Sequence, residues 1–348
     1  MNPAPAALGL LLGLVAAAGA RAESGFLENL HKAESRAEPE DRVEFYGRAI
    51  VAWKASDSKA LLADCRFRRG EALAERYEFA KAEADLSAAL KLDAANARAR
   101  LLRGKVRLHL NRPGQAAGDF KAYTAAERED VEGWLALGEA ERKAGQAREA
   151  EKAYARAQAL APEDFRPALG RARLLAAQTL WSKALALLNE ADKLAEGRSP
   201  EVLTQRGDCL FVLGWTTPER GLKDYGKAIA LYEARLLDLQ RSRAAPARFS
   251  EGQAETSLPY FGRGRLYEFL QKIPEAVSDY TQACRLGHKQ ACARAKALSE
   301  RLPPAPAPKK APEPEFKPVK PKWHWFKFKR KIERGEEEGD PGLRIYSN

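Results

Sequence analysis

Residues 131–164, VEGWLALGEAERKAGQAREAEKAYARAQALAPED, have the pattern of two amphipathic helices joined by a short turn. Trp134 and Leu137 fall at a three-residue interval, which places both side chains on one face of a helix. The turn at 143–145 ends in glycine, and Pro162 follows the second apolar run. Both features interrupt helical periodicity, so the stretch predicts a helical hairpin.

The pattern recurs along the chain, at first every 34 residues and then at spacings of 35 and 57. A small residue lies near the middle of each predicted first helix: Gly70, Gly104, Gly138, Ala172, Gly207 and Gly264. A second small residue follows it: Ala82, Ala116, Ala150, Ala184, Gly221 and Ala276. A large side chain comes next: Leu86, Phe120, Tyr154, Leu188, Tyr225 and Tyr280. A further core position then gives Ala89, Tyr123, Ala157, Ala191, Ala228 and Ala283. A period of 34 residues is typical of stacked helical hairpins.

The chain resembles the tetratricopeptide repeat family. Its best copy, 131–164, carries the family's marker residue types: Trp134, Leu137, Gly138, Ala150, Tyr154, Ala157 and Pro162. An arginine stands before the small residue, where leucine is commoner in the family: Arg69, Arg103, Arg171, Arg206 and Arg263. The resemblance covers about residues 63–290 and implies an all-α protein, an α-solenoid of stacked antiparallel helical hairpins. Each hairpin is amphipathic and buries its apolar face only against its neighbours.

The four recurring positions, which we call columns, give the boundaries of the predicted repeats. We expect repeats at 63–96, 97–130, 131–164, 165–199, 200–235 and 257–290, followed by a capping helix to residue 302. Residues 23–62 form a degenerate hairpin, whose second helix is clearer than its first. Residues 236–256 are an insertion. Its start extends the preceding helix, and we interpret the rest as a tolerated loop, with a functional edge as the alternative.

The two ends of the chain differ in composition from the repeats. The apolar run from Ala6 to Ala20 and the Ala20-Arg21-Ala22 cleavage pattern predict a signal peptide at 1–22, with an uncleaved anchor as the alternative. We therefore expect an exported protein, most simply periplasmic, or else extracellular. Residues 303–348 begin with a proline-rich spacer that cannot form a helix or a packed core, so we expect a disordered tail.

Charge and motif content favour binding over catalysis. The formal net charge is +11, which favours acidic partners without selecting one class. No phosphate-binding loop or nucleophile–base arrangement occurs in the sequence, and the four histidines are scattered without metal-ligand spacing. We therefore expect no enzyme, no cofactor and no metal site.

Two of the four cysteines form a candidate disulfide. Cys284 and Cys292 lie eight residues apart across an expected helix–helix turn, close enough for a bond. The segment also resembles cysteine-rich Sel-one-like repeats, exported relatives in which such a bridge joins neighbouring helices. Two reduced, buried cysteines are the alternative. Cys65 and Cys209 fall in different repeats and are expected to be buried thiols.

The resemblance implies a concave groove lined by first-helix residues. Carried over position by position, these are Phe67, Glu71, Leu101, Lys105, Leu135, Glu139, Leu169, Arg173, Thr204, Asp208, Phe261 and Arg265. Members of the family that clamp a terminal carboxylate need Lys and Asn where Phe67 and Glu71 stand, so a free C-terminus is not the expected ligand. The mixed chemistry suits an amphipathic or extended peptide, and a merely solvated face is the alternative.

The tail contains a cluster of aromatic and basic residues: Trp323, Trp325, Phe326, Lys327, Phe328, Lys329, Arg330 and Lys331. It can insert at an anionic membrane surface, or dock on an envelope polymer, a partner protein or the solenoid. Stacking on nucleic acid is the least expected use, because export separates the protein from it. The sequence thus predicts a non-enzymatic envelope scaffold that binds a protein through the groove. A peripheral membrane- or envelope-binding protein that acts through the tail is the alternative.

Overall fold

The computed structural model describes residues 25–213, 218–242 and 246–301. Every regular element in these ranges is an α-helix, which confirms the predicted all-α solenoid. The chain divides into two units, Met1–Leu302 and Pro303–Asn348. The predicted signal peptide at 1–22 and the tail cluster at 323–331 lie outside the described residues.

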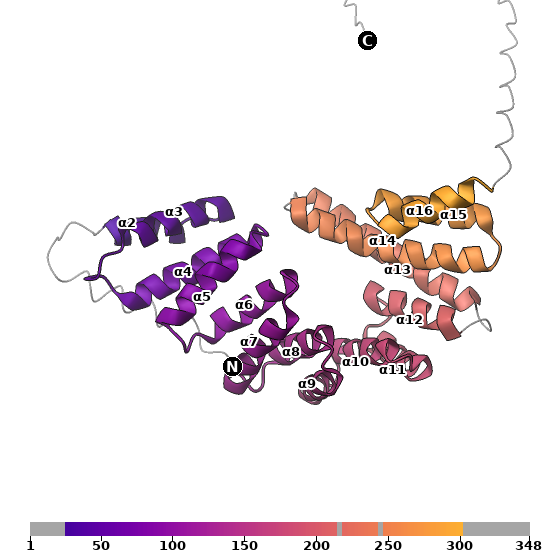
Figure 1. The fold of residues 1–348 in the computed structure, drawn as a ribbon, viewed down its shortest axis with the longest axis horizontal. Helices are drawn as coiled ribbons and strands as arrows, with labels where there is room; N and C mark the ends of the chain where they lie inside the picture. The colour runs from indigo at the N-terminus through magenta and orange to yellow at the C-terminus, as the bar shows by residue number, and fades with distance from the viewer. Residues whose placement is uncertain (1–24, 214–217, 243–245, 302–348) are drawn as a thin grey trace, which may run out of the picture. The chain divides into compact units, whose positions relative to one another are not determined.

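Consecutive helices pair as hairpins. The pairs are α2 (Gly25–Glu34) with α3 (Pro39–Ala52), α4 (Lys59–Glu75) with α5 (Phe79–Leu92), α6 (Ala97–His109) with α7 (Pro113–Ala126), α8 (Val131–Lys143) with α9 (Ala147–Leu160), α10 (Phe165–Ala177) with α11 (Trp181–Leu194), α12 (Pro200–Leu213) with α13 (Pro218–Arg241), and α14 (Pro246–Phe269) with α15 (Ile273–Arg285). A last helix, α16 (Lys289–Ser299), packs on α15. The first helices of the central hairpins lie on the inner side of the curved stack and the second helices on its outer side (Figure 1).

Short local signals set the helix ends. Asn96, Asp130 and Asp164 are N-caps whose side chains accept hydrogen bonds from backbone N–H groups of the following first helix. The turn between first and second helix contains a residue with positive φ, and four of these keep the 34-residue step: Tyr77, Asn111, Gly145 and Thr179. Only one of the four is glycine, so packing holds the other three in a conformation that side chains disfavour.

Aromatic side chains of second helices seat on glycines of first helices. A Cβ atom on Gly138 would lie 2.6 Å from the Tyr154 ring, and one on Gly170 would lie 2.4 Å from it. Tyr154 is therefore held between its own first helix, α8, and the next one, α10. Tyr225 is held in the same way between Gly207 and Gly262. These contacts join one hairpin to the next and explain why the first small-residue column, which contains Gly138 and Gly207, must be small.

Most of the insertion at 236–256 is helical, because α13 continues to Arg241 and α14 begins at Pro246. The loop interpretation is therefore wrong for residues 246–256, which form the start of α14, whereas the expected extension of the preceding helix is present as the end of α13. The two extensions pack on each other, since a Cβ on Gly252 would lie 2.8 Å from Leu239 Cδ1. The polar and proline-containing sequence concealed this pairing, because its helical signal depends on the neighbouring helix.

The described array begins with the helices α2 and α3 and ends with α16. The poorly matching first helix is α2, whose Phe26 and Leu30 are buried in a cluster with Tyr46 of α3. Cys284 and Cys292 lie in disulfide-bonding geometry with their Cα atoms 4.7 Å apart. Cys65 and Cys209 are buried thiols, and burial raises the pKa of each to about 12.

Four of the five arginines that depart from the family pattern have an aspartate partner on the second helix of the same repeat. Each guanidinium donates two hydrogen bonds to one carboxylate, in the pairs Arg69–Asp85, Arg103–Asp119, Arg206–Asp224 and Arg263–Asp279. The four aspartates are buried. A bidentate pair fixes distance and orientation together, so it sets the register of the two helices.

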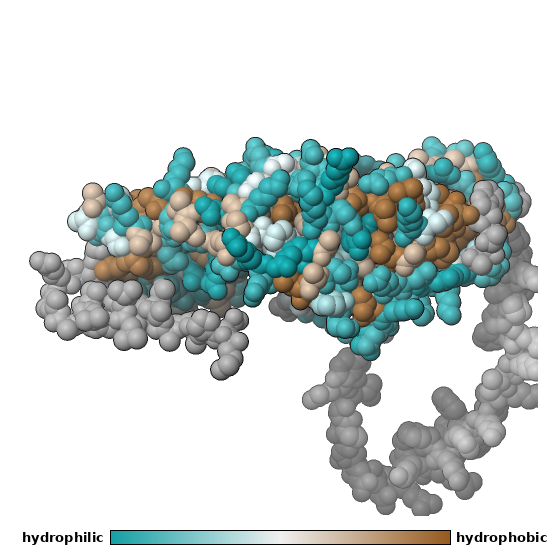
Figure 2. Space-filling view, turned by 90° about the horizontal axis from the view of Figure 1, so that it is seen from below, coloured by the Kyte–Doolittle hydropathy of each residue, from teal (hydrophilic) through white to brown (hydrophobic). Residues whose placement is uncertain are grey.

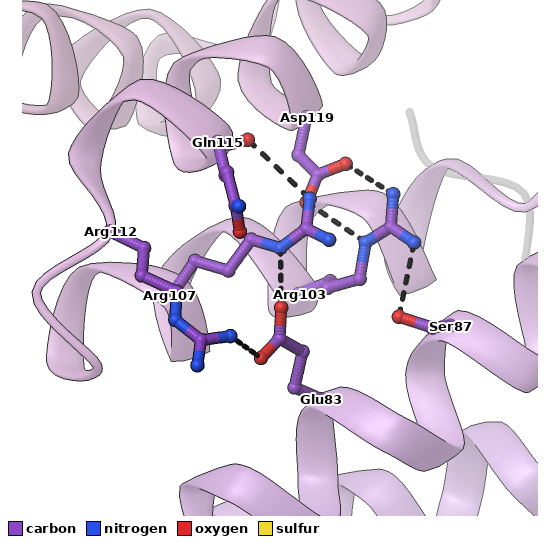
Figure 3. Close-up of polar contacts among 7 residues, drawn as sticks. All are labelled: Glu83, Ser87, Arg103, Arg107, Arg112, Gln115 and Asp119. Atoms are coloured by element: carbon purple, nitrogen blue, oxygen red, sulfur yellow. Dashed lines mark hydrogen bonds and ion pairs between the residues drawn. The ribbon is translucent and has the colours of Figure 1, made fainter.

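These pairs also extend between repeats (Figure 3). Arg103 donates to Asp119 at 2.9 and 2.5 Å and to Ser87 Oγ of the preceding repeat at 3.3 Å. Arg107 bridges the same two repeats, donating to Glu83 at 2.9 Å and to Asp119 at 2.8 Å. The buried charges at this junction are thus compensated from both sides.

Two repeats lack the pair. In the third repeat Leu137 and Ala153 stand at the arginine and aspartate positions, with the same 16-residue separation. In the fourth, Arg171 is present but Leu187 replaces the aspartate, and Arg171 instead pairs with Glu151 of the preceding repeat at 2.7 Å. The third repeat shows that the hairpin also forms with an apolar pair at these positions.

Changing Gly138 to valine tests the seating of the aromatic rings. Because the new side chain collides with Tyr154, we expect Gly138→Val to lower the free energy of unfolding by about 2–3 kcal/mol. Gly118→Val is the matched control, since a Cβ at this exposed position of α7 has no neighbour within 4 Å. Urea unfolding followed by circular dichroism measures both. Equal stability of the two variants would contradict the packing argument.

Changing one member of the Arg263–Asp279 pair tests the ion pairs. Arg263→Leu leaves the buried Asp279 carboxylate uncompensated, so we expect a loss of about 3 kcal/mol in urea unfolding. The double variant Arg263→Leu/Asp279→Ala reproduces the Leu137–Ala153 arrangement. It should recover at least about 1 kcal/mol relative to the single variant, by removing the unpaired charge. A double variant less stable than Arg263→Leu would refute this explanation.

Candidate partner-binding face

The predicted groove residues lie on the first helices of six successive hairpins, two on each helix: Phe67 and Glu71 on α4, Leu101 and Lys105 on α6, Leu135 and Glu139 on α8, Leu169 and Arg173 on α10, Thr204 and Asp208 on α12, and Phe261 and Arg265 on α14. Figure 1 shows the central members of this helix set on the inner side of the stack. The structure therefore brings these positions onto successive rungs of one array. We call them the inner face.

The inner face is unequally accessible. Phe67, Leu169 and Thr204 are buried. Phe67 and Leu169 belong to apolar clusters between helices, and the Thr204 hydroxyl donates to the Pro200 carbonyl at 2.7 Å. These three offer a partner little surface. Lys105 is exposed, and the other eight positions are half-buried.

The acidic side chains in the middle of the inner face have partners within the protein. Glu139 accepts hydrogen bonds from Arg142 at 2.7 and 2.9 Å and from the Tyr154 hydroxyl at 3.2 Å. Burial pushes the pKa of Glu139 upward, but Arg142 and the nearby charge of Arg173 outweigh it and hold the pKa below its usual range. Glu139 is therefore a fixed anion, already engaged.

Asp208 occupies the corresponding position on α12. The hydroxyl of Tyr225 donates to its Oδ1 at 2.8 Å. Burial raises the pKa of Asp208, opposed by that hydrogen bond and by the charge of Arg265. Like Glu139, this carboxylate is thus bound to the aromatic side chain that seats on the glycine of its own repeat.

An aromatic and cationic cluster lies at the C-terminal end of the array. The Arg265 guanidinium lies over the Phe211 ring, 4.4 Å from its centroid. Phe261 stacks on His288, with centroids 4.1 Å apart. The His288 imidazole also caps α16, accepting a hydrogen bond from Ala291 N–H at 3.2 Å. This histidine therefore has a structural role between the two cysteines.

Two cations of the inner face have no hydrogen-bond or ion-pair partner in the part of the chain that the structure describes. Among the described residues, neither Lys105 on α6 nor Arg173 on α10 makes a hydrogen bond or an ion pair. They flank α8, on which Leu135 is half-buried, and Leu101 lies one turn before Lys105. The central inner face thus combines two cations that lack hydrogen-bond and ion-pair partners among the described residues with partly exposed leucines.

The paired extensions of α13 and α14, residues 233–241 and 246–256, form an arm beside the inner face. Arg235 joins the arm to α12 through Glu201 at 3.2 Å. At the arm's other contact, the Tyr77 hydroxyl donates to Glu251 Oε2 at 3.1 Å, across 174 residues of sequence. Burial raises the pKa of Glu255 on the arm, although the charges of Arg235 and Arg173 oppose it.

The described part of the chain contains neither a candidate metal site nor a candidate membrane span. No group of three or more His, Cys, Asp or Glu side chains within residues 25–213, 218–242 and 246–301 is arranged to hold a metal ion. No helix in these ranges is both long and apolar enough to span a membrane.

Sequence reasoning missed two features of the surface. It noted the arginine column but not the aspartates that pair with it, although a second column at a fixed distance was available in Asp85, Asp119 and Asp279. It also missed the arm, because no periodic signal links Tyr77 to Glu251. Contacts between residues far apart in a repeat array do not follow from the repeat.

Comparisons with known proteins support the repeat fold. The sequence profile of the tetratricopeptide repeat family matches residues 131–164. A tetratricopeptide repeat protein from Parabacteroides merdae ATCC 43184 is similar in structure, with a TM-score of 0.62, 16% identity, and coverage of 79% of this chain and 99% of that one. No curated protein matches the sequence significantly.

A second solved structure extends the same similarity. A chain of the APC/C hetero-tetramer Cut9-Hcn1 has a TM-score of 0.53 and 14% identity, and the match covers 79% of this chain and 49% of that one. At such identities the similarity concerns the fold alone. The profile match at 131–164 and the recurring columns support a tetratricopeptide repeat protein, and the solved structures show the same fold.

Proposed function

We propose that this protein is a non-enzymatic scaffold that binds a segment of another protein along its inner face. Tetratricopeptide repeat proteins generally bind protein partners and are generally non-catalytic. The observation that carries the proposal is that the inner-face carboxylates have partners within the protein, whereas two inner-face cations have none in the described ranges. Lys105 and Arg173 have no hydrogen bond or ion pair among the described residues, whereas Glu139 and Asp208 are engaged.

This arrangement favours an extended or amphipathic segment with carboxylates and apolar side chains. Its carboxylates gain unpaired cations without having to displace an internal partner. Its apolar side chains cover the half-buried Leu101 and Leu135, which water otherwise contacts. Since successive first helices repeat the same positions, a segment that runs along the array meets one first helix after another at a regular spacing.

The arm favours a single segment over a folded domain. The hydrogen bond from Tyr77 to Glu251 joins the α4–α5 turn to the start of α14, and we infer that this contact restricts access to the inner face from that side. A peptide can pass such a constraint, whereas a globular domain would have to break it.

We place this scaffold in a bacterial cell envelope, in the periplasm or outside the cell. Two features support this location: the apolar run and cleavage pattern at 1–22, and the bonding geometry of Cys284 and Cys292, which an oxidising compartment would use. Envelope assembly and secretion are settings that fit such a scaffold. The aromatic and basic cluster at 323–331 supports the second candidate, a peripheral membrane- or envelope-binding protein whose solenoid is a spacer.

Pull-down from solubilised envelopes of the source cells distinguishes these functions. We expect Lys105→Glu/Arg173→Glu to lose at least about 90% of the co-purifying partner, because like charges then oppose its carboxylates. The matched control is Lys223→Glu/Lys227→Glu, which makes the same charge change at two exposed positions of the second helix α13. Circular dichroism verifies that both variants are folded.

A truncation before Pro303 completes the experiment. The groove proposal predicts that the truncated protein retains the partner that the inner-face variant loses. Loss of the partner on truncation, with full retention by Lys105→Glu/Arg173→Glu, would overturn the proposal in favour of the tail. Binding of the full chain, but not of the truncation, to vesicles with anionic lipids would add the membrane as the tail's target.

A further inference from the structure

The missing ion pair of the third repeat leaves a cleft on the side of the second helices. At the neighbouring junction, Arg103 fills the space between α5, α6 and α7 by contacting Ser87 and Asp119 (Figure 3). At the next junction, between α7, α8 and α9, the corresponding residues are Leu137 and Ala153. These side chains are shorter and line a cleft of about 590 Å³.

The cleft has an apolar base. Leu137 and Ala153 are buried, and Trp134 of α8 lines the same space. The indole N–H of Trp134 donates to the Arg128 carbonyl at 2.9 Å, which fixes the ring against the end of α7. The volume falls within the range of ordinary ligand pockets, which combine apolar walls with a few polar groups.

The rim of the cleft is basic. Lys121, Arg128, Lys152 and Arg156 line it, against two carboxylates, Glu141 and Glu149. Lys121 Nζ lies 2.5 Å from the buried Glu141 Oε1, and Lys152 Nζ lies 2.8 Å from Glu149 Oε1. The carboxylates are therefore neutralised by the two lysines.

The two arginines remain available. Among the described residues, Arg156 makes no hydrogen bond or ion pair, and Arg128 donates only to the Ala125 carbonyl at 3.3 Å. Both are exposed. Planar guanidinium groups recognise carboxylates with paired hydrogen bonds, and here they lie beside an apolar base.

A second cleft lies at the next junction, between α9, α10 and α11. There Leu187 replaces the aspartate, Arg171 turns toward Glu151, and the cleft of about 430 Å³ opens beside them. Lys152 lines both clefts. Figure 2 shows the molecule from below, the side of α9 and α11, with hydrophobic side chains exposed among hydrophilic ones. The two clefts thus adjoin where the regular ion pairs are absent.

We propose that the cleft between α7, α8 and α9 is a second binding site, for an acidic segment of a partner protein. An Asp or Glu side chain of the segment pairs with Arg128 and Arg156, and a neighbouring apolar side chain packs on Trp134, Leu137 and Ala153. The site belongs to the outer side of the stack and does not use the inner-face cations, so the protein holds two segments at once.

Filling the cleft from within tests this site. Leu137→Arg/Ala153→Asp installs the pair found in four other repeats at the same positions, so the hairpin has a precedent for folding in this form. The probe is a fluorescein-labelled synthetic peptide that alternates glutamate with leucine and phenylalanine, and its affinity for the full chain is measured by fluorescence anisotropy. We expect the filled variant to bind at least about tenfold more weakly than the unmodified protein.

Charge variants keep the test decisive if the filled variant unfolds. Arg128→Gln/Arg156→Gln should weaken binding by a similar factor, and Lys223→Gln/Lys227→Gln on α13 should leave it unchanged. A peptide with glutamine in place of glutamate should bind at least about tenfold more weakly. Undiminished binding by Arg128→Gln/Arg156→Gln would overturn the proposal. So would loss of peptide binding in Lys105→Glu/Arg173→Glu alone, which would assign the peptide to the inner face.

Discussion

The architecture depends on the close approach of two helices that glycine permits and an aromatic ring completes. Tyr154 touches the glycine of its own repeat and a glycine of the next, and Tyr225 repeats this arrangement. The hydroxyls at the ends of these rings then donate to Glu139 and Asp208 on the inner face. One side chain therefore joins two hairpins and fixes a carboxylate of the candidate binding surface. Packing and the candidate binding surface therefore cannot be changed independently at these positions.

Most of the fold was predictable because the same short-range packing contacts recur in each repeat. Small residues at Gly104 and Gly138, large ones at Phe120 and Tyr154, and the polar turns follow a fixed period, and the structure confirms the hairpins that they predict. The start of α14 was not predictable, since its polar sequence is helical only against the end of α13. The groove positions followed from the resemblance, but their accessibility did not. Phe67 and Leu169 are buried because neighbouring repeats cover them, which a single repeat does not reveal.

The buried arginine–aspartate pairs divide the array into two kinds of junction. Where Arg103 or Arg206 is present, charge fills the space between second helices and fixes the register. Where Leu137 and Ala153 replace the pair, the hairpin keeps its geometry and the space opens. The third repeat is the one that the family profile matches, so the repeat closest to the family pattern is one of the two that lack the pair in this chain. Its difference from the others supplies a surface feature that the regular repeats lack.

Site-specific photo-cross-linking tests most directly whether the inner face holds a partner. A benzophenone amino acid replaces Lys105 on the inner face or, as the reference, Lys227 on α13, and cells that produce either protein are irradiated. The account predicts a light-dependent adduct with one partner protein at position 105 and none with that protein at position 227. Adducts that form at position 227 and not at position 105 would contradict it.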